Sequence, residues 1–164
     1  MSLKQISIDL HRHNRWANEK LLTAIPSGIE DLEFVSSFTS IRKTAYHIWD
    51  ADWYWLMRLH GNDVSFCPPS GIFEGTFLEG IQKLLMKEDE ILVFLESQDE
   101  VYFNTALIYK NTKEDEFTHT IFNVLQHLAM HSMFHRGQLV TLLRQVGATK
   151  IPATDLIVYF REGN

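Results

Sequence analysis

The chain has 164 residues, and the 45% that are hydrophobic provide enough apolar material for one packed core but not for two ordinary domains. We therefore expect one domain over residues 1–164, and the modest charged fraction of 22% excludes an intrinsically disordered chain. Twenty-one acidic residues against fifteen Lys and Arg give a net charge of −6, which argues against a nucleic-acid partner because that role needs a basic surface.

Two amphipathic helices are expected in the first part of the chain. The first runs from about Leu3 to Ile25, and Pro26-Ser27-Gly28 ends it because proline cannot continue a helix. A polar connector, Ile29 to Thr39, follows. The second helix starts near Ser40, whose hydroxyl can cap the first turn, and stops at Gly61.

The rest of the chain predicts two more long helices separated by a hairpin. Apolar spacing indicates a third helix from about Phe77 to Leu95. Residues 101–109 and 116–120 are typical of two short strands around a polar turn. The last long helix runs from about Ile121 to Val146, and a short helix through Phe160 closes the chain. We expect an all-α, up-and-down four-helix bundle with a short β-hairpin before the last long helix and a short C-terminal helix.

The cellular compartment is predicted from what the chain lacks. No apolar run approaches the roughly 20 residues that span a membrane, and the start does not have the order of a signal peptide. The single cysteine, Cys67, permits no internal disulfide. It precedes Pro68-Pro69 in a loop without a nearby histidine, so we interpret it as an ordinary loop residue. These features favour a cytoplasmic protein without a membrane partner.

Three histidines lie along one face of the last long helix. His127, His131 and His135 are four residues apart, which places neighbouring imidazoles about 6 Å apart at Cβ. Two imidazoles at this spacing can direct a nitrogen each at one ion. The alternative is that one or more of them are core histidines that bond to backbone or water.

His47 supplies a candidate third ligand from the second helix. It lies in an apolar context, TAYHIWDADWYW, and a buried imidazole needs partners for both nitrogens. Three neutral histidines from two helices would leave coordination positions open, which is typical of a catalytic site. The alternative for His47 is a hydrogen-bonded core residue.

Other catalytic patterns are absent from the sequence. A di-iron bundle needs Glu-x-x-His on two helices, whereas the one instance, Glu116 to His119, lies in the predicted hairpin. There is no His-Glu-x-x-His, glycine-rich phosphate loop or nucleophilic serine motif.

Several segments together resemble the DinB-like family, the damage-inducible proteins that include thiol S-transferases using bacillithiol. The most specific part is HSMFHRGQL, from His131 to Leu139, followed by Gly147 and by PATDLIVYF at 152–160. NRWANEKLL at 14–22 is similar to the family's first helix, and the segment around His47 to its second. The resemblance covers nearly the whole chain.

The resemblance implies a four-helix bundle, commonly a homodimer, that holds a divalent metal through three histidines. Carried over residue by residue, the ligands are His47, His131 and His135. His127, one turn earlier, is assigned to the surroundings of the ligands, with replacement of one of them as the alternative.

Helical spacing names the other residues near such a metal. Asp50 and Tyr54 share a helix face with His47, and Gln138 shares one with the histidines of the last helix. Asp50 can accept a hydrogen bond from a ligand histidine or act as a solvated or capping acid, and Tyr54 can be a core aromatic. Arg136 either belongs to the pocket or anchors its helix. No general acid or base can be named from the sequence.

These features predict a metal-dependent enzyme acting on a small molecule. The resemblance favours transfer of a low-molecular-weight thiol to an electrophile in a stress or detoxification role, with Zn or Ni as the divalent transition metal. The alternatives are a hydrolase that uses metal-activated water and a non-catalytic protein that binds a metal or a ligand.

Overall fold

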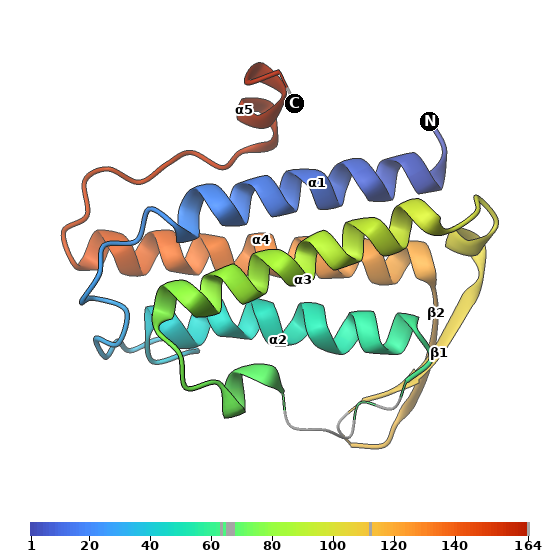
Figure 1. The fold of residues 1–164 in the computed structure, drawn as a ribbon, viewed down its shortest axis with the longest axis horizontal. Helices are drawn as coiled ribbons and strands as arrows, with labels where there is room; N and C mark the ends of the chain where they lie inside the picture. The colour runs from blue at the N-terminus through green and yellow to red at the C-terminus, as the bar shows by residue number, and fades with distance from the viewer. Residues whose placement is uncertain (63, 65–67, 112, 164) are drawn as a thin grey trace.

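The computed structural model describes residues 1–62, 64, 68–111 and 113–163. Cys67, expected to be an ordinary loop residue, lies outside the described residues. The described part contains the elements shown in Figure 1: α1 (Leu3–Leu22), α2 (Ile41–Leu59), α3 (Phe77–Ser97), β1 (Ala106–Lys110), β2 (Glu116–Thr120), α4 (Ile121–Gln145) and α5 (Leu156–Arg161), with 3-10 turns η1 (Pro69–Ile72) and η2 (Tyr102–Asn104). The predicted helical class, the hairpin and the short C-terminal helix are confirmed.

Each long helix begins after a hydroxyl side chain that accepts a backbone N–H of the first turn. These caps are Ser2, Ser40, Thr76 and Thr120. They satisfy amides that would otherwise lack a partner, so the local sequence sets where each helix starts. α1 ends at Leu22, earlier than the expected Ile25, because the amides of Ala24 and Ile25 bond three residues back instead of four.

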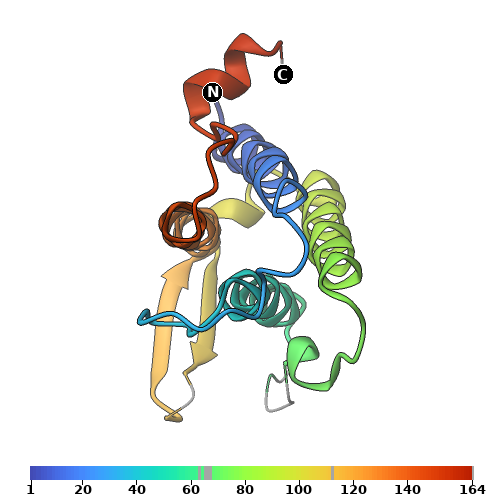
Figure 2. The ribbon, with the colours of Figure 1, turned by 90° about the vertical axis from the view of Figure 1, so that its left-hand side faces the viewer.

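The four long helices do not strictly alternate in direction along the chain. α1 and α4 run one way and α2 and α3 run the other, so α3 begins at the same end of the bundle as α2 (Figures 1 and 2). The simple up-and-down order expected from the sequence therefore differs at the connection between α2 and α3. α2 ends at Leu59 and α3 begins at Phe77 at the other end of the bundle, so a short turn does not join them; the described part of this connection includes η1.

The hairpin leads directly into α4. β1 and β2 are antiparallel, with Ala106 opposite Thr120 and Lys110 opposite Glu116. The first strand is shorter than the predicted 101–109, because residues 102–104 form η2 and bury Phe103 completely. Thr120 ends β2 and caps α4, so the pairing of the strands also fixes where α4 begins.

The core consists of two apolar clusters with polar residues between them. One cluster gathers the end of α1, the starts of α2 and α3 and the end of α4, and the other gathers the opposite halves of these helices. Between the clusters lie six buried polar side chains, which we call the polar layer: Asn14, Asn18, Asp52, Glu88, Ser132 and Arg136.

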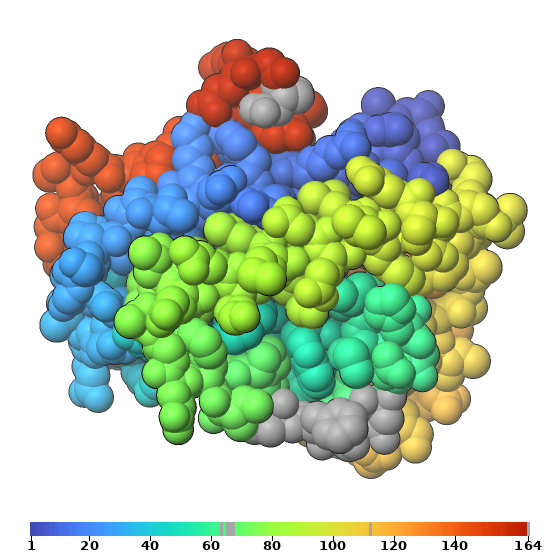
Figure 3. All heavy atoms as spheres, viewed as in Figure 1, coloured from blue at the N-terminus to red at the C-terminus, as the bar shows by residue number. Residues whose placement is uncertain are grey.

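The face on which α2 and α4 meet is turned away from the viewer in Figure 1. The space-filling view shows α1, α3 and α2 side by side over the front of the molecule (Figure 3). The view along the bundle shows α4 beside α2, with the hairpin reaching past both (Figure 2). Among the described residues, no helix has the length and hydrophobicity needed to cross a membrane.

Candidate metal centre

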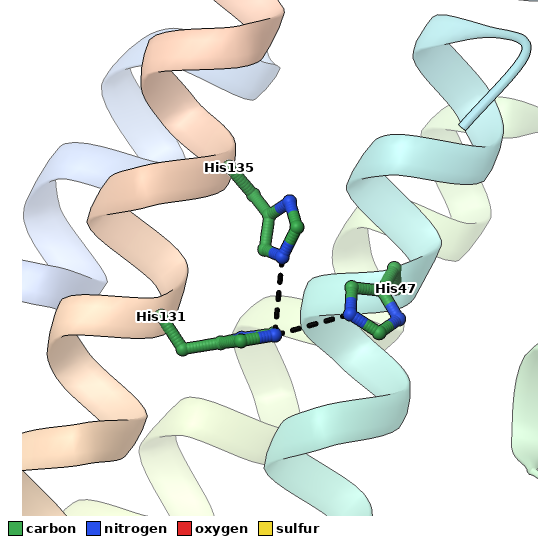
Figure 4. A group of neighbouring side chains, drawn as sticks. All are labelled: His47, His131 and His135. Carbon is green, nitrogen blue, oxygen red and sulfur yellow. Dashed lines mark hydrogen bonds between the residues drawn. The ribbon is translucent and has the colours of Figure 1, made fainter. Parts of the chain in front are cut away.

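Three histidines meet where α2 packs against α4. His47 lies in the first half of α2, and His131 and His135 occupy successive turns of α4 (Figure 4). Nε2 of His131 is 3.0 Å from Nε2 of His47 and 3.1 Å from Nε2 of His135. We call these three residues the histidine cluster; it is the one group of metal-ligating side chains found among the described residues.

The spacing of the nitrogens fits a single metal ion. With metal–nitrogen bonds of about 2.0–2.1 Å, nitrogens this far apart subtend an angle of about 95° at the ion, close to that between adjacent ligands of an octahedron. Only one proton is available on each ring nitrogen, so His131 Nε2 cannot donate to both neighbours. A cation at the centre would satisfy all three lone pairs at once.

Gln138 orients one of the rings. Its side-chain oxygen lies 2.8 Å from Nδ1 of His135 and accepts the proton there. This interaction places the proton of neutral His135 on Nδ1 and leaves the Nε2 lone pair facing the other two histidines. Metal-binding histidines are generally held by such a bond from the second nitrogen.

All three histidines are held in the neutral form that a metal requires. Burial, with smaller effects of the neighbouring imidazoles, lowers the pKa of His131 to about 3. Burial and the nearby His135 lower the pKa of His47 to about 4, and burial also lowers the pKa of His135. Neutral imidazoles have free lone pairs at physiological pH, so no proton competes with a metal.

Aromatic side chains cover the histidine cluster. Phe38 stacks on His47 with the ring centroids 4.3 Å apart, and it also contacts His135. Phe134, which is 63% exposed, contacts His135 from α4. A cavity of about 540 Å³ adjoins His47, a volume typical of small-molecule sites. It is lined by Phe38, Arg42, Lys43, Tyr46, His47, Asp50, Ser70, Phe73, Glu74 and Gly75.

Each of the three other residues expected near the metal has its own contacts. His127 is exposed and lies beside the cluster, with its ring 5.8 Å from that of His131. Asp50 accepts hydrogen bonds from the backbone N–H and the hydroxyl of Ser70, so it holds η1 against α2 as a capping acid. Tyr54 packs against Trp53.

Arg136 points away from the cluster into the polar layer. Its Nη1 donates to the side-chain oxygens of Asn14 and Asn18 and to the hydroxyl of Ser132. Both asparagines donate in turn to Glu88 Oε1, at 2.8 and 2.6 Å. Arg136 therefore takes the anchoring role that the sequence left open, and it ties α4 to α1 and α3.

Two parts of this arrangement were missed at the sequence level. The residues of the polar layer are isolated polar residues on four different helices, and they share no sequence motif. Phe38 lies in the irregular connector between α1 and α2, where no periodicity indicates which side chain turns inward. The polar layer and the position of Phe38 can both be recognised only from the packing of the folded chain.

The comparisons with known proteins agree with the residue pattern. A model of the DinB family matches residues 1–161. Protein DinB of Bacillus subtilis (strain 168) is 25% identical over 166 residues, which cover 96% of this chain and 95% of that protein. The match spans α1 to α5 and includes all three members of the histidine cluster.

Proposed function

The chain belongs to the DinB family and directs three imidazole nitrogens at one point, and on this basis we propose that it is a metal-dependent thiol S-transferase. Its substrates are a low-molecular-weight thiol and an electrophilic small molecule, which fits a role in stress or detoxification. The observation that carries the proposal is the pair of 3.0 and 3.1 Å separations between ring nitrogens, supported by the bond from His135 to Gln138.

Each residue of the cluster has a distinct part in this proposal. His47, His131 and His135 hold the ion, with Zn or Ni as the candidates, and Gln138 fixes one ring. Phe38 and Phe134 limit the access of water. A divalent ion held by three histidines supplies positive charge that favours the thiolate form of a thiol. Because three protein ligands leave positions open, a small molecule can reach the site.

The proposed reaction is a nucleophilic displacement. The thiol loses its proton to solvent, its sulfur forms a bond to the electrophilic carbon, and the bond from that carbon to the leaving group breaks. The leaving group departs as an anion with the electron pair. A thiol must be reduced to take part, so the proposal places the protein in a reducing compartment such as the cytoplasm.

Conjugation of a model electrophile tests the proposal. The metal-loaded protein is assayed with 1-chloro-2,4-dinitrobenzene and bacillithiol, mycothiol or glutathione. We expect conjugation above the uncatalysed rate with at least one thiol, its loss in His131→Ala, and its retention in His60→Ala, a histidine beyond the C-terminus of α2 that lies outside the cluster. No turnover with any of the three thiols at full metal occupancy would exclude the transferase.

A second assay, without thiol, separates the two alternatives. Turnover of an ester or amide panel without any thiol would favour a hydrolase that uses the same histidines. Absence of turnover in both assays, with one ion bound per chain, would favour a protein that binds a metal or ligand without catalysis.

We also propose that the protein forms a homodimer through the exposed face of α4. Met130, Met133 and Phe134 are 54%, 56% and 63% exposed, and they lie three and four residues apart on this helix. Exposed apolar rows of this kind mark interfaces between chains. Light scattering should give twice the 19.1 kDa chain mass, and Met130→Lys with Met133→Lys should give the chain mass alone. A wild-type monomer at micromolar concentration would contradict the dimer.

A further inference from the structure

A second, smaller pocket lies next to the histidine cluster. It has a volume of about 210 Å³ and is formed where α2, the hairpin and the start of α4 meet. We call it the hairpin pocket; its lining is Trp55, Tyr109, His119, Asn123, Val124 and His127. None of the three clustered histidines lines it, so it is distinct from the candidate metal centre.

His127 connects the two sites. Its ring centroid lies 5.6 Å from that of Trp55 in the hairpin pocket and 5.8 Å from that of His131 in the cluster. Asn123 is two helical turns before His131, which corresponds to about 12 Å along α4. A ligand that reaches from the cluster into the pocket is therefore an extended small molecule.

Among the described residues, no acidic side chain lines the hairpin pocket, although the chain carries a net charge of −6. A cation lies against its aromatic walls: the Arg58 guanidinium is 4.7 Å from the ring centroid of Trp55 and 5.2 Å from that of Tyr109. One Arg58 nitrogen, Nη2, donates to the carbonyl of Lys110, whereas its buried Nε has no partner among the described residues. The local field therefore favours an anion over a cation.

Hydrogen-bond donors complete the pocket. The Tyr109 hydroxyl lies 3.2 Å from Nδ1 of His119. When that hydroxyl donates, the proton of neutral His119 resides on Nε2, which can donate to an anion. Asn123 adds a side-chain amide, and His127 adds a second imidazole. Two or more such donors are a recurrent way to bind a carboxylate.

We propose that the hairpin pocket binds a carboxylate of the thiol co-substrate. The carboxylate would lie about 6–12 Å from the sulfur, because α4 rises by about 6 Å from His127 to His131 and by about 12 Å from Asn123 to His131. This inference rests on the proposed transferase function and names the chemical class of its co-substrate. The thiol end lies at the histidine cluster, and the acidic end lies against His119, Asn123 and His127. A neutral thiol of the same size lacks the second contact and binds less tightly.

A ligand that cannot react tests the pocket by itself. S-Methylglutathione carries two carboxylates and no thiol, and its binding is followed through the histidine ring signals in NMR spectra of the full-length protein. We expect saturable shifts of the His119 and His127 signals, while the His60 signal in the same spectrum stays fixed. The dimethyl ester of this ligand, which lacks the carboxylates, should bind about tenfold more weakly, as expected for a lost hydrogen bond to a charged group.

Variants give the matched controls. His119→Phe keeps a ring of similar size against Tyr109 and Phe117 but removes the donor, and Asn123→Ala removes the amide. Each should weaken S-methylglutathione binding about tenfold and leave the metal content unchanged, and His60→Phe should leave both unchanged. Equal binding of acid and ester, tighter binding of the ester, or no shift of His119 would overturn the assignment of the pocket. A wild-type protein that binds this ligand without conjugating any thiol would overturn the transferase and keep the pocket.

Discussion

His135 and Arg136 are neighbours on α4, yet their side chains leave the helix in different directions and contact different parts of the molecule. Nε2 of His135 faces His131 at the seam with α2, whereas Nη1 of Arg136 lies 2.5 Å from the side-chain oxygen of Asn14 in the core. One residue turns the side-chain direction by about 100° in an α-helix. The hydrogen bonds of Arg136 therefore set the rotation of α4 about its axis, and this rotation determines the direction in which the His135 side chain points.

Metal removal should lower the thermal stability of the protein. A metal bound at a hundred times its Kd stabilises the folded state by about 2.7 kcal/mol, which corresponds to about 5–10 °C in Tm for a chain of this size. Scanning calorimetry with and without a chelator measures this shift, and elemental analysis counts the ions. His131→Ala should contain no stoichiometric ion and show no chelator effect, whereas His127→Ala should behave as wild type. A chelator effect that survives in His131→Ala would place the ion elsewhere.

Gln138→Leu should weaken metal binding without unfolding the protein. The substitution removes the acceptor that holds Nδ1 of His135 and allows the ring to turn. Loss of such a partner typically costs 10–100-fold in metal affinity, and competition with a chromophoric chelator measures it. Gln145→Leu, an exposed glutamine at the end of the same helix, is the matched control. Equal affinities of the two variants would exclude an orienting role for Gln138.

Arg136→Met should destabilise the fold strongly. It removes the buried cation of the polar layer and leaves Glu88 and Asp52, both fully buried, without compensation. Removal of one partner from a buried charged group costs about 3–5 kcal/mol, and urea denaturation gives the value. Arg144→Met, on the exposed surface of α4, should cost less than about 0.5 kcal/mol. Adding Glu88→Gln to Arg136→Met should recover part of the lost free energy of unfolding. If the double variant recovers none of it, Arg136 and Glu88 are not coupled.

The polar layer should also give the protein a distinct pH dependence. Burial raises the pKa of Glu88 from its ordinary 4.5 to about 7, although Asn18 and Arg136 oppose the rise. Since the folded form holds the proton more tightly, the stability from this group is complete below about pH 4.5 and is lost as the pH rises through about 7.

Glu88→Gln isolates this contribution, because the amide oxygen of glutamine can still accept from Asn14 and Asn18. In urea denaturation, the free energy of unfolding of wild type should fall, relative to that of the variant, by on the order of 1–3 kcal/mol between pH 5 and pH 7.5. A difference between the two proteins that does not change over this range would show that Glu88 keeps one protonation state.

Much of the fold could be predicted from local sequence. The capping hydroxyls and the glycines with positive φ at 61 and 147 mark helix ends, because capping depends on residues within one turn. The direction of α3 relative to α2 could not be predicted. It depends on which helices bury their apolar faces together, and this is not a property of one segment.

The candidate site divides in the same way. His131 and His135 could be placed on one face without coordinates, because a spacing of four residues has this effect once the segment is helical. His47 could be named as their companion through the family resemblance alone, and its contact with His131 depends on how α2 packs against α4. The bond from His135 to Gln138 and the turn of Arg136 into the core could be seen in the folded chain alone. These contacts join residues through the packing of four separate helices, and packing is governed by the combined fit of their side chains instead of by the periodicity of any one helix.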